Sequence, residues 1–239
     1  MPLPQIATPT YELTLPSTGE TIDYRPFLVK EEKLLVLAME TEDTKDITKA
    51  VKTVIKNCIQ TKGVKVEELP TFDIEYLFLN IRGKSVGEEV EVKIICPDDG
   101  KTQVPVTINI DEIEVEKDKN HTTKFAIDEN LMIEMKYPSL DQFIKSNFDF
   151  SGGNQMEQSF ELISTCVDKI FNEEEVWVAA DFSKKELMDF IESMNSTQFK
   201  KIESFFETMP KLKHEIKVKN PETGKSSLVV LEGLSSFFG

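Results

Sequence analysis

The first quarter of the chain changes from alternating to helical spacing of its apolar residues. Residues 10–15 and 21–27 alternate between polar and apolar side chains, and Pro16-Ser17-Thr18-Gly19 separates them. Alternation on both sides of such a turn is typical of a β-hairpin. Apolar residues then fill positions 34–39, which predicts a helix buried on most sides. Residues 47–59 carry apolar side chains at three- and four-residue spacing, which predicts an amphipathic helix.

A third helix and a β region follow. Residues 72–81 are rich in aromatic and aliphatic side chains and predict a mostly buried helix, stopped by Gly83. From residue 88 to 137 the pattern favours strands. An alternating run ending at Cys96 is joined to a second alternating run by a turn containing Asp99-Gly100, and this arrangement is a strong hairpin signal. Further short strands are expected at residues 112–116, 123–127 and 131–137.

Helical spacing returns in residues 138–210. Ser183 and Glu186 have the spacing of a capping box at a helix start, and residues 199–209 carry the apolar stripe of a last long helix. Two more apolar helix faces are expected: Phe143, Ile144 and Phe148, and then Met156, Phe160, Ile163, Val167 and Ile170. Residues 214–218 and 227–231 then flank a turn and predict a closing hairpin.

The predicted fold class is therefore α+β, with antiparallel hairpins, a small sheet and segregated helices, including a helical segment between two similar hairpins. Four segments are expected. Residues 1–87 form an N-terminal hairpin plus helices, 88–137 an antiparallel β region and 138–210 a helical region. Residues 211–239 form a hairpin and an apolar tail that pack with 88–137.

Two turn sequences resemble each other. Residues 93–101 and 217–225 both have a strand, a Pro-X-X-Gly-Lys turn and a second strand. The two hairpins could face each other, or the similarity could be chance. A zinc ribbon places its ligands at such turns, here Cys96, Asp99, Asn220 and Thr223. Tetrahedral zinc takes four thiolate or imidazole ligands, whereas these positions supply one thiolate, so no metal is expected.

Other catalytic motifs are incomplete. Gly83-Lys84-Ser85 and Gly224-Lys225-Ser226 match the end of a phosphate-binding loop, but Phe78 and Lys219 stand where its first glycine is required. The only histidines, His121 and His214, have charged or polar neighbours, which does not indicate a nucleophile's base.

The remaining candidates for chemistry are thiols and carboxylates. Cys58 and Cys166 lie on apolar helix faces, where a small buried side chain is the expected role. Paired carboxylates such as Asp98-Asp99 are common in so acidic a chain and indicate a solvated face. No catalytic residue and no cofactor is therefore predicted.

The charge balance excludes whole classes of partner. The 239 residues include 43 acidic and 28 basic side chains, for a net charge of −15. Binding to nucleic acid or to an anionic membrane needs clustered Lys and Arg, and Arg25 and Arg82 are the only arginines. We therefore expect neither partner. Such a charge instead favours solubility for a protein with apolar surfaces that await partners.

Cysteine usage and the N-terminus indicate a reducing compartment. Three separated cysteines do not form a disulfide framework. The first seven residues lack the charged and apolar regions of a signal peptide, and no apolar run is long enough to span a membrane.

Large apolar side chains mark a possible interaction surface. The chain holds 16 Phe and 8 Met, with adjacent pairs at Phe205-Phe206 and Phe237-Phe238. Neighbouring residues on a helix cannot both point inward. We therefore name Phe205, Phe206, Leu234, Phe237 and Phe238 as candidate partner-binding residues. The alternative is that the apolar C-terminal end docks onto the protein's own core.

Long sequence strings carry a family resemblance. Residues 1–4, 24–33, 69–85, 96–100 and 137–140 resemble the baseplate hub proteins of T-even-type contractile-tailed phages. The likeness is good over about residues 1–150 and weaker beyond. The strings carry no catalytic roles, so no functional residue transfers from them.

The resemblance implies a non-enzymatic protein of tail morphogenesis that binds other baseplate hub proteins, as a hub subunit or an assembly chaperone. Its expected location is the host cytoplasm during assembly or the tail baseplate of the virion, and its oligomeric state stays open. One alternative is a metal-dependent or hydrolytic enzyme built on Cys96, Asp98 and Asp99. Another is an acidic adaptor with no connection to the virion.

Overall fold

The computed structural model describes residues 6–41, 43–140, 142, 155–233 and 236. They belong to two units. The discontinuous unit comprises Met1–Glu116 and Lys211–Gly239, and the inserted unit comprises Lys117–Pro210. The chain therefore leaves the first unit after its strand β5, builds the second, and returns to complete the first.

The discontinuous unit begins with the predicted hairpin and three helices. The hairpin strands pair antiparallel, with Tyr11 opposite Tyr24. Leu15 and Ile22 are buried beneath it. The elements are β1 (Tyr11–Thr14), β2 (Thr21–Tyr24), α1 (Val29–Glu40), α2 (Thr44–Cys58), the 3-10 turn η1 (Val66–Glu68) and α3 (Thr71–Val86).

Helix α1 is less buried than its apolar run predicts. Of residues 34–39 only Ala38 is buried, while Val36, Leu37 and Met39 are about half exposed. The expectation of a helix buried on most sides is wrong, because α1 contacts α2 along one face and leaves apolar side chains on another.

Helix α3 continues past Gly83, where the sequence predicted its end. The glycine lies inside the helix against Ile110, so that a Cβ there would stand 3.4 Å from the Ile110 side chain. It allows close packing rather than stopping the helix. The end comes at Gly87, whose φ of 120° is unfavourable for residues with a side chain.

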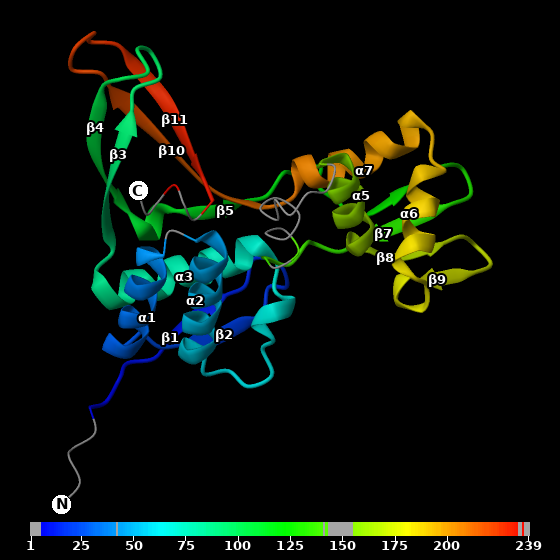
Figure 1. Cartoon of the computed structure of the whole chain (residues 1–239), viewed down its shortest axis with the longest axis horizontal. Helices are drawn as coiled ribbons and strands as arrows, with labels where there is room; N and C mark the ends of the chain where they lie inside the picture. Colours follow the sequence, from blue (N-terminus) through cyan, green and yellow to red (C-terminus); the bar gives the residue numbers. More distant parts are fainter. Residues whose placement is uncertain (1–5, 42, 141, 143–154, 234–235, 237–239) are drawn as a thin grey trace, which may run out of the picture. The chain divides into compact units, whose positions relative to one another are not determined.

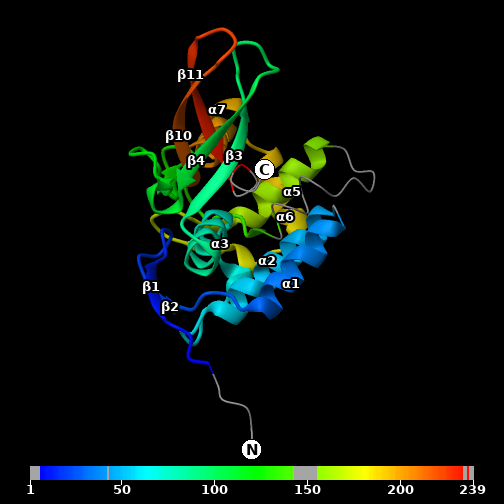
Figure 2. The same ribbon diagram turned by 90° about the vertical axis from the view of Figure 1, so that its left-hand side faces the viewer.

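Two long hairpins complete the discontinuous unit and lie side by side with their turns at the same end (Figures 1 and 2). The first pairs β3 (Glu89–Ile95) with β4 (Gln103–Asn109). The second pairs β10 (Lys211–Lys219) with β11 (Ser226–Glu232). After the 3-10 turn η2 (Ile110–Glu112), β5 (Glu114–Glu116) joins the second hairpin in the order β11-β10-β5.

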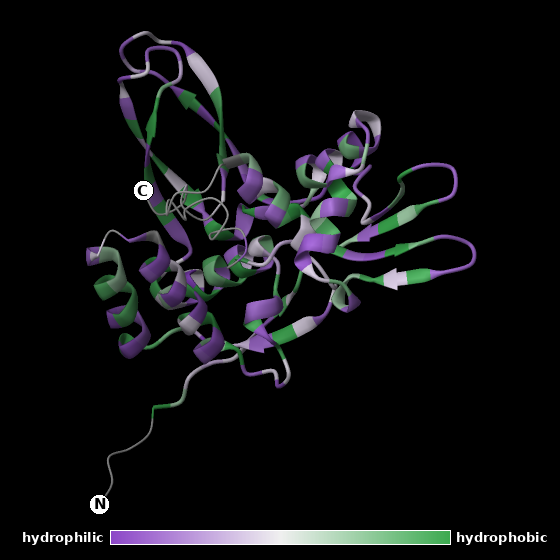
Figure 3. Ribbon diagram, turned by 45° about the vertical axis from the view of Figure 1, so that its right-hand side comes forward, coloured by the Kyte–Doolittle hydropathy of each residue, from purple (hydrophilic) through white to green (hydrophobic). Residues whose placement is uncertain are grey.

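A shared apolar cluster lies between the two hairpins and α3. Apolar and polar residues alternate along the strands (Figure 3), so each hairpin has one buried face. Its buried members are Leu79, Val90, Val92, Ile94, Cys96, Ile108, Ile110, Ile113, Leu212, Ile216 and Val218. The hairpins therefore pack through side chains while their strands belong to separate sheets.

The inserted unit is an antiparallel sheet with helices. Its strands β6 (Lys124–Ala126), β7 (Met132–Met135), β8 (Val167–Phe171) and β9 (Val176–Val178) lie in chain order. Its helices are α5 (Gln155–Cys166), α6 (Lys184–Glu192) and α7 (Ser196–Thr208), with the 3-10 turn η3 (Ala179–Asp181) after β9. Ser183 and Glu186 form the predicted capping box of α6. The segment 88–137 is thus shared, with β3 to β5 in one unit and β6 and β7 in the other.

Strands β8 and β9 correct the expectation of an all-helical segment. The sequence spacing predicts Val167 and Ile170 on a helix face with Met156, Phe160 and Ile163, yet α5 ends at Cys166. The next residues pair with β7, with Ile170 opposite Ile133. The predicted face of Phe143, Ile144 and Phe148 lies outside the described residues.

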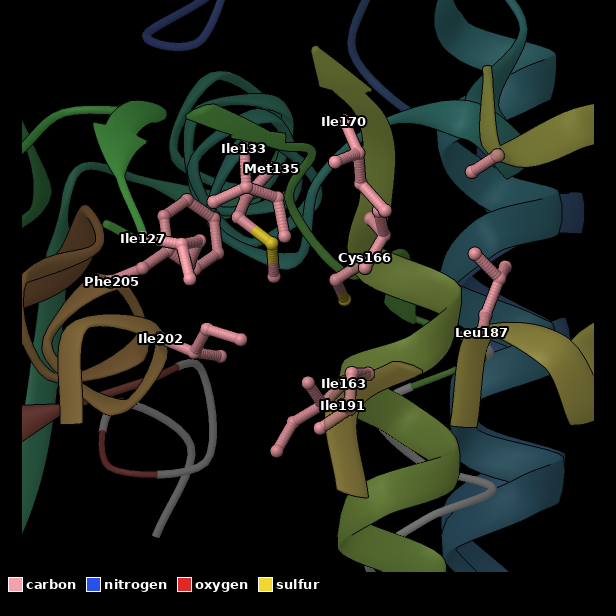
Figure 4. Close-up of a cluster of buried hydrophobic side chains, with 12 residues drawn as sticks. Ile127, Ile133, Met135, Ile163, Cys166, Ile170, Leu187, Ile191, Ile202 and Phe205 are labelled. Carbon is pink, nitrogen blue, oxygen red and sulfur yellow. The ribbon is translucent and has the colours of Figure 1, made fainter. Parts of the chain in front are cut away.

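The core of the inserted unit lies where its sheet meets its helices (Figure 4). Ile133 from the sheet, Cys166 from α5, Ile191 from α6 and Ile202 from α7 are all essentially inaccessible to solvent. The α+β class is confirmed in both units. Within the described residues, no helix has the length and apolar character needed to cross a bilayer.

Candidate functional site

The two similar turns have matching main-chain geometry. In the first, Gly100 N–H donates to the Cys96 carbonyl at 2.9 Å, and in the second, Gly224 N–H donates to the Asn220 carbonyl at 2.9 Å. Both glycines have positive φ, 64° and 73°. Each turn therefore needs glycine at its last position, which explains the shared Pro-X-X-Gly spacing.

Side chains join the two turns directly. The Asn220 amide nitrogen donates to Asp98 Oδ1 at 3.0 Å and to Asp99 Oδ2 at 2.9 Å. The Thr223 hydroxyl donates to Asp98 Oδ2 at 2.5 Å. Asn220 is 1% exposed, so its amide is a buried polar group with its donors satisfied. We call Asp98, Asp99, Asn220 and Thr223 the tip contact.

Each turn also uses these side chains internally. Asp99 Oδ1 accepts from the N–H groups of Lys101 and Thr102, at 2.9 and 3.0 Å. Asn220 Oδ1 accepts from Glu222 N–H at 2.8 Å. Hydrogen bonds from the Thr102 hydroxyl and from the Lys101 and Thr102 N–H groups hold the pKa of Asp99 well below its usual range. The hydrogen bonds from Thr223 and Asn220 lower that of Asp98.

The structure brings together the positions of a zinc ribbon but not its chemistry. Asp99 and Asn220 meet, with Cys96 and Thr223 in the same two turns. One thiol, one carboxylate, one amide and one hydroxyl do not match the thiolate and imidazole set that zinc requires. Among the residues that the structure describes, no group of three His, Cys, Asp or Glu side chains is placed to hold a metal.

The electrostatics of this region do not favour catalysis either. Burial and the nearby carboxylates of Asp98 and Asp99 raise the pKa of the Cys96 thiol, which keeps it protonated at neutral pH. Carboxylates with lowered pKa values are weak bases. The arrangement suits a structural contact between the hairpins better than the enzyme alternative built on Cys96, Asp98 and Asp99.

The other two thiols are buried, as the apolar helix faces predict. Burial raises the pKa of Cys58 to about 11 and that of Cys166 to about 12. Both are fully enclosed and act as small core residues. The phosphate-loop candidates also have structural roles: Gly83 lies within α3 and Gly224 in a hairpin turn.

His121 links three segments of the inserted unit through its side chain, and the sequence did not indicate this role. Its Nδ1 lies 2.9 Å from the Thr208 hydroxyl, and its Nε2 lies 2.9 Å from the Tyr137 hydroxyl. The ring also stacks on Tyr137. Burial, with a smaller contribution from Lys117, lowers the His121 pKa. The ring joins the loop before β6 to α7, and only the tertiary structure shows this.

A buried ion pair organises one of the strings that carried the family resemblance. Arg25 Nη2 lies 3.2 Å from Glu31 Oε1, and Leu28 N–H donates to Glu31 Oε2 at 2.8 Å. Burial alone would raise the Glu31 pKa, but these two interactions outweigh it and lower the pKa. Phe27 N–H donates to Ser85 Oγ at 2.9 Å, which ties this string to the end of α3.

The candidate partner-binding residues divide into two groups. Phe205 is 2% exposed in the core of the inserted unit and stacks on Tyr137, while Phe206 is half-buried and meets Phe205 edge-on. Leu234, Phe237 and Phe238 lie outside the described residues. Of the two candidates that the structure describes, Phe206 therefore has accessible surface that a partner could contact, whereas Phe205 is buried.

Exposed apolar side chains are more prominent elsewhere. On α1, Val29, Val36, Leu37 and Met39 are 49–80% exposed. On β11, Leu228 and Val230 are also exposed. Leu228 and Val230 alternate with the half-buried Val229 and Leu231, so they lie on the face of the strand that points away from the apolar cluster.

Comparison with known proteins places the chain. The family described as T4 bacteriophage base plate protein matches residues 8–239. The chain belongs to this family. It is 25% identical over 233 residues to the baseplate hub assembly protein gp26 of Enterobacteria phage T4, covering 95% of this chain and 97% of that protein. No solved structure matches it.

The family membership confirms the resemblance seen in the sequence strings. A base plate protein of this family is expected to act by contact with other proteins, and the buried pairs described above are internal.

Proposed function

We propose that this protein takes part in assembly of the central hub of a phage baseplate by binding other hub proteins, without performing a chemical reaction. The observation that carries the proposal is the family match over residues 8–239. The likeness to a hub assembly protein over 95% of the chain supports the more specific role proposed here.

The described surfaces support a binding role. The thiols are buried, and the paired aspartates are engaged in hydrogen bonds. Apolar side chains instead lie exposed along α1, where Val36 and Met39 are 49% and 57% accessible. Burial of such side chains against a partner supplies the main driving force for association. Phe206, Leu234, Phe237 and Phe238 are further candidates for the same role.

The finer proposal is that the protein acts as an assembly factor in the host cytoplasm. It is supported by the name of the similar phage T4 protein, which refers to hub assembly. Mass spectrometry of purified virions and of infected-cell lysate tests it. We expect the protein in hub intermediates and not in virions. A stoichiometric amount in virions would assign a hub subunit instead, and absence from both would contradict the hub role.

Infection with phage lacking this protein tests the broader function. We expect baseplates without a complete hub, rescued by the wild-type chain. A variant with Val36→Lys and Met39→Lys should rescue poorly, because lysines oppose burial of this face in a partner. Val86→Lys, at a residue 55% exposed on α3, is the matched control. Normal hubs without the protein would reject the proposal.

A further inference from the structure

Strand β11 has a free edge. It is the end strand of the β11-β10-β5 sheet, and no other described strand pairs with its outer side. Its seven residues pair with β10 in continuous register from Ser226 opposite Lys219 to Glu232 opposite Lys213. In an antiparallel pair, alternate residues direct their N–H and C=O groups away from the partner strand. The outer edge of β11 therefore presents a regular row of main-chain donors and acceptors.

This edge lacks the features that normally prevent pairing. Edge strands are commonly protected by charged side chains, proline or a bulge. Residues 226–231 contain no charged residue and no proline, and the register shows no bulge. Leu228 and Val230 are 61% and 43% exposed on the outward face. The strand is thus open to addition of a further strand with apolar side chains.

The outward face of the hairpin carries Lys217 and Lys219 near the turn, while Glu215, opposite Val230, and Glu232, opposite Lys213, lie on the same face farther from the turn. Residues directly opposite each other in a sheet point to the same side. Leu228 therefore lies beside Lys217, and Ser226 beside Lys219. Lys211, Lys217 and Lys219 are exposed. Lys213 lies on the same face, and its ammonium group forms ion pairs with Glu116 and Glu215.

The neighbouring hairpin provides an internal contrast. The outward side chains of β3 are Glu89, Glu91, Lys93 and Ile95. That face is more acidic than the β10–β11 face and has one exposed apolar residue, Ile95, at 53%. Strand β9 is another apolar sheet edge, but it has only three residues and follows Glu173-Glu174-Glu175. The β10–β11 face is therefore the better docking surface.

We propose that the edge and outward face of β11 bind an extended, acidic segment of a partner protein, which adds to the sheet as a further strand. Main-chain hydrogen bonds would provide the pairing, apolar side chains would cover Leu228 and Val230, and carboxylates would meet Lys217 and Lys219. A second copy of this chain fits less well, because each copy carries −15 and β11 itself has a single acidic residue, Glu232. The proposal rests on the binding role proposed above and specifies the chemistry of the partner segment.

Hydrogen exchange on the full chain tests the proposal with peptides of defined chemistry. The first probe is an end-capped peptide with threonine at every second position and two glutamates followed by two valines at the positions between, so that the glutamates and valines lie on one face of an added strand, and the second has lysine in place of glutamate. We expect the acidic peptide to slow exchange of β11 amides that point away from β10. The basic peptide should leave them unchanged. Charge reversal by Lys217→Glu and Lys219→Glu should reverse this preference.

Matched variants locate the site. Leu228→Ser with Val230→Ser removes the apolar contact without adding charge and should weaken binding of the acidic peptide about tenfold or more, whereas Ile95→Ser on β3 should not. Circular dichroism of each variant checks that it folds. Equal protection by both peptides, protection elsewhere, or no protection would overturn the proposal. Protection of β11 that grows with protein concentration, without peptide, would assign the edge to a second copy and also overturn it.

The result is separable from the proposed function. If the Leu228→Ser and Val230→Ser variant still supports hub assembly and the peptides do not bind, this docking surface is rejected while the hub role stands. If hubs form normally without the protein, the hub role fails whatever the peptides show.

Discussion

Asn220 donates a hydrogen bond to Asp99 across the tips of two hairpins that are 121 residues apart in the chain, with a nitrogen–oxygen distance of 2.9 Å. The same amide reaches Asp98 at 3.0 Å. Two turns with the spacing of zinc-ribbon knuckles are thus joined by amide and carboxylate groups. Hydrogen bonds to ionised groups are stronger than those between neutral groups, and this one is formed by a buried amide.

Replacing Asn220 should loosen the discontinuous unit. Asn220→Ala removes the donors to Asp98 and Asp99 and the acceptor for Glu222 N–H. The expected loss of stability is about 1–3 kcal/mol. The rate of Cys96 labelling in urea reports opening of this unit. Asn57→Ala, at an exposed position of α2, should change stability by less than about 0.5 kcal/mol. Equal behaviour of the two variants would contradict a stabilising tip contact.

The tip contact should weaken in acid. The pKa of Asp99 is lowered in the folded protein, chiefly by the Thr102 hydroxyl and the turn amides, so the folded state binds fewer protons than the unfolded state. Its contribution is therefore present above the unfolded pKa of about 3.9 and is lost as pH falls through the lowered folded value. The stability difference between wild type and Asp99→Asn should shrink from neutral pH to about pH 3. A constant difference in urea titrations would refute this.

Three substitutions should convert the paired turns into a zinc site. With Cys96 already present, Asp99→Cys, Asn220→Cys and Thr223→Cys complete two Cys-Pro-X-Cys-Gly turns. We expect one equivalent of Co²⁺ or Zn²⁺ to bind with four thiolates, seen as the intense charge-transfer and d–d absorption of tetrahedral cobalt. Adding Cys96→Ser should weaken binding markedly. If no thiolate–cobalt band appears, the turns are not arranged as knuckles.

The adjacent phenylalanines of α7 should differ in their effect on stability. Phe205 is buried among Tyr137, His121 and the core, so Phe205→Ala should cost about 3–5 kcal/mol. Phe206 is half-buried, and Phe206→Ala should cost clearly less. Urea unfolding followed by fluorescence of Trp177, the single tryptophan, measures both within the inserted unit. A larger loss for Phe206→Ala would contradict the assigned packing.

The three thiols should resist alkylation until the protein opens. All are free and buried, and the pKa values of Cys58 and Cys166 are raised to about 11 and 12. Iodoacetamide reacts with thiolate, and thiols with such raised pKa values hold little thiolate at pH 8. Mass spectrometry should show slow labelling in the native protein and complete labelling in urea. Rapid native labelling of Cys166 would show that the inserted unit opens far more readily than its core indicates.

Removing the C-terminal residues should affect binding more than folding. Deletion of residues 234–239, which include Leu234, Phe237 and Phe238, is expected to weaken association with hub proteins more than it lowers the melting temperature. Binding assays and thermal melts of the same variant measure the two effects. Unchanged affinity with a lost fold would assign these residues to the core instead.

Local patterns in the sequence determined the features that depend on near neighbours. The Ser183–Glu186 capping box, the turns ending at Gly100 and Gly224 and the alternation of the long hairpins all follow from contacts a few residues apart. The α+β class and the sequence strings that resemble baseplate hub proteins could also be recognised from local sequence. Each such segment carries its own hydrogen-bonding and spacing requirements in its residues.

Only the tertiary structure decided the features that depend on distant partners. Residues 167–171 became a strand because β7 and β9 pair with them, Gly83 stayed helical because Ile110 lies against it, and α1 kept apolar side chains exposed. The meeting of Asn220 with Asp98 and Asp99 also required the chain to return after the inserted unit. Pairing and burial are set by residues far away in the chain, so spacing along one segment cannot specify them.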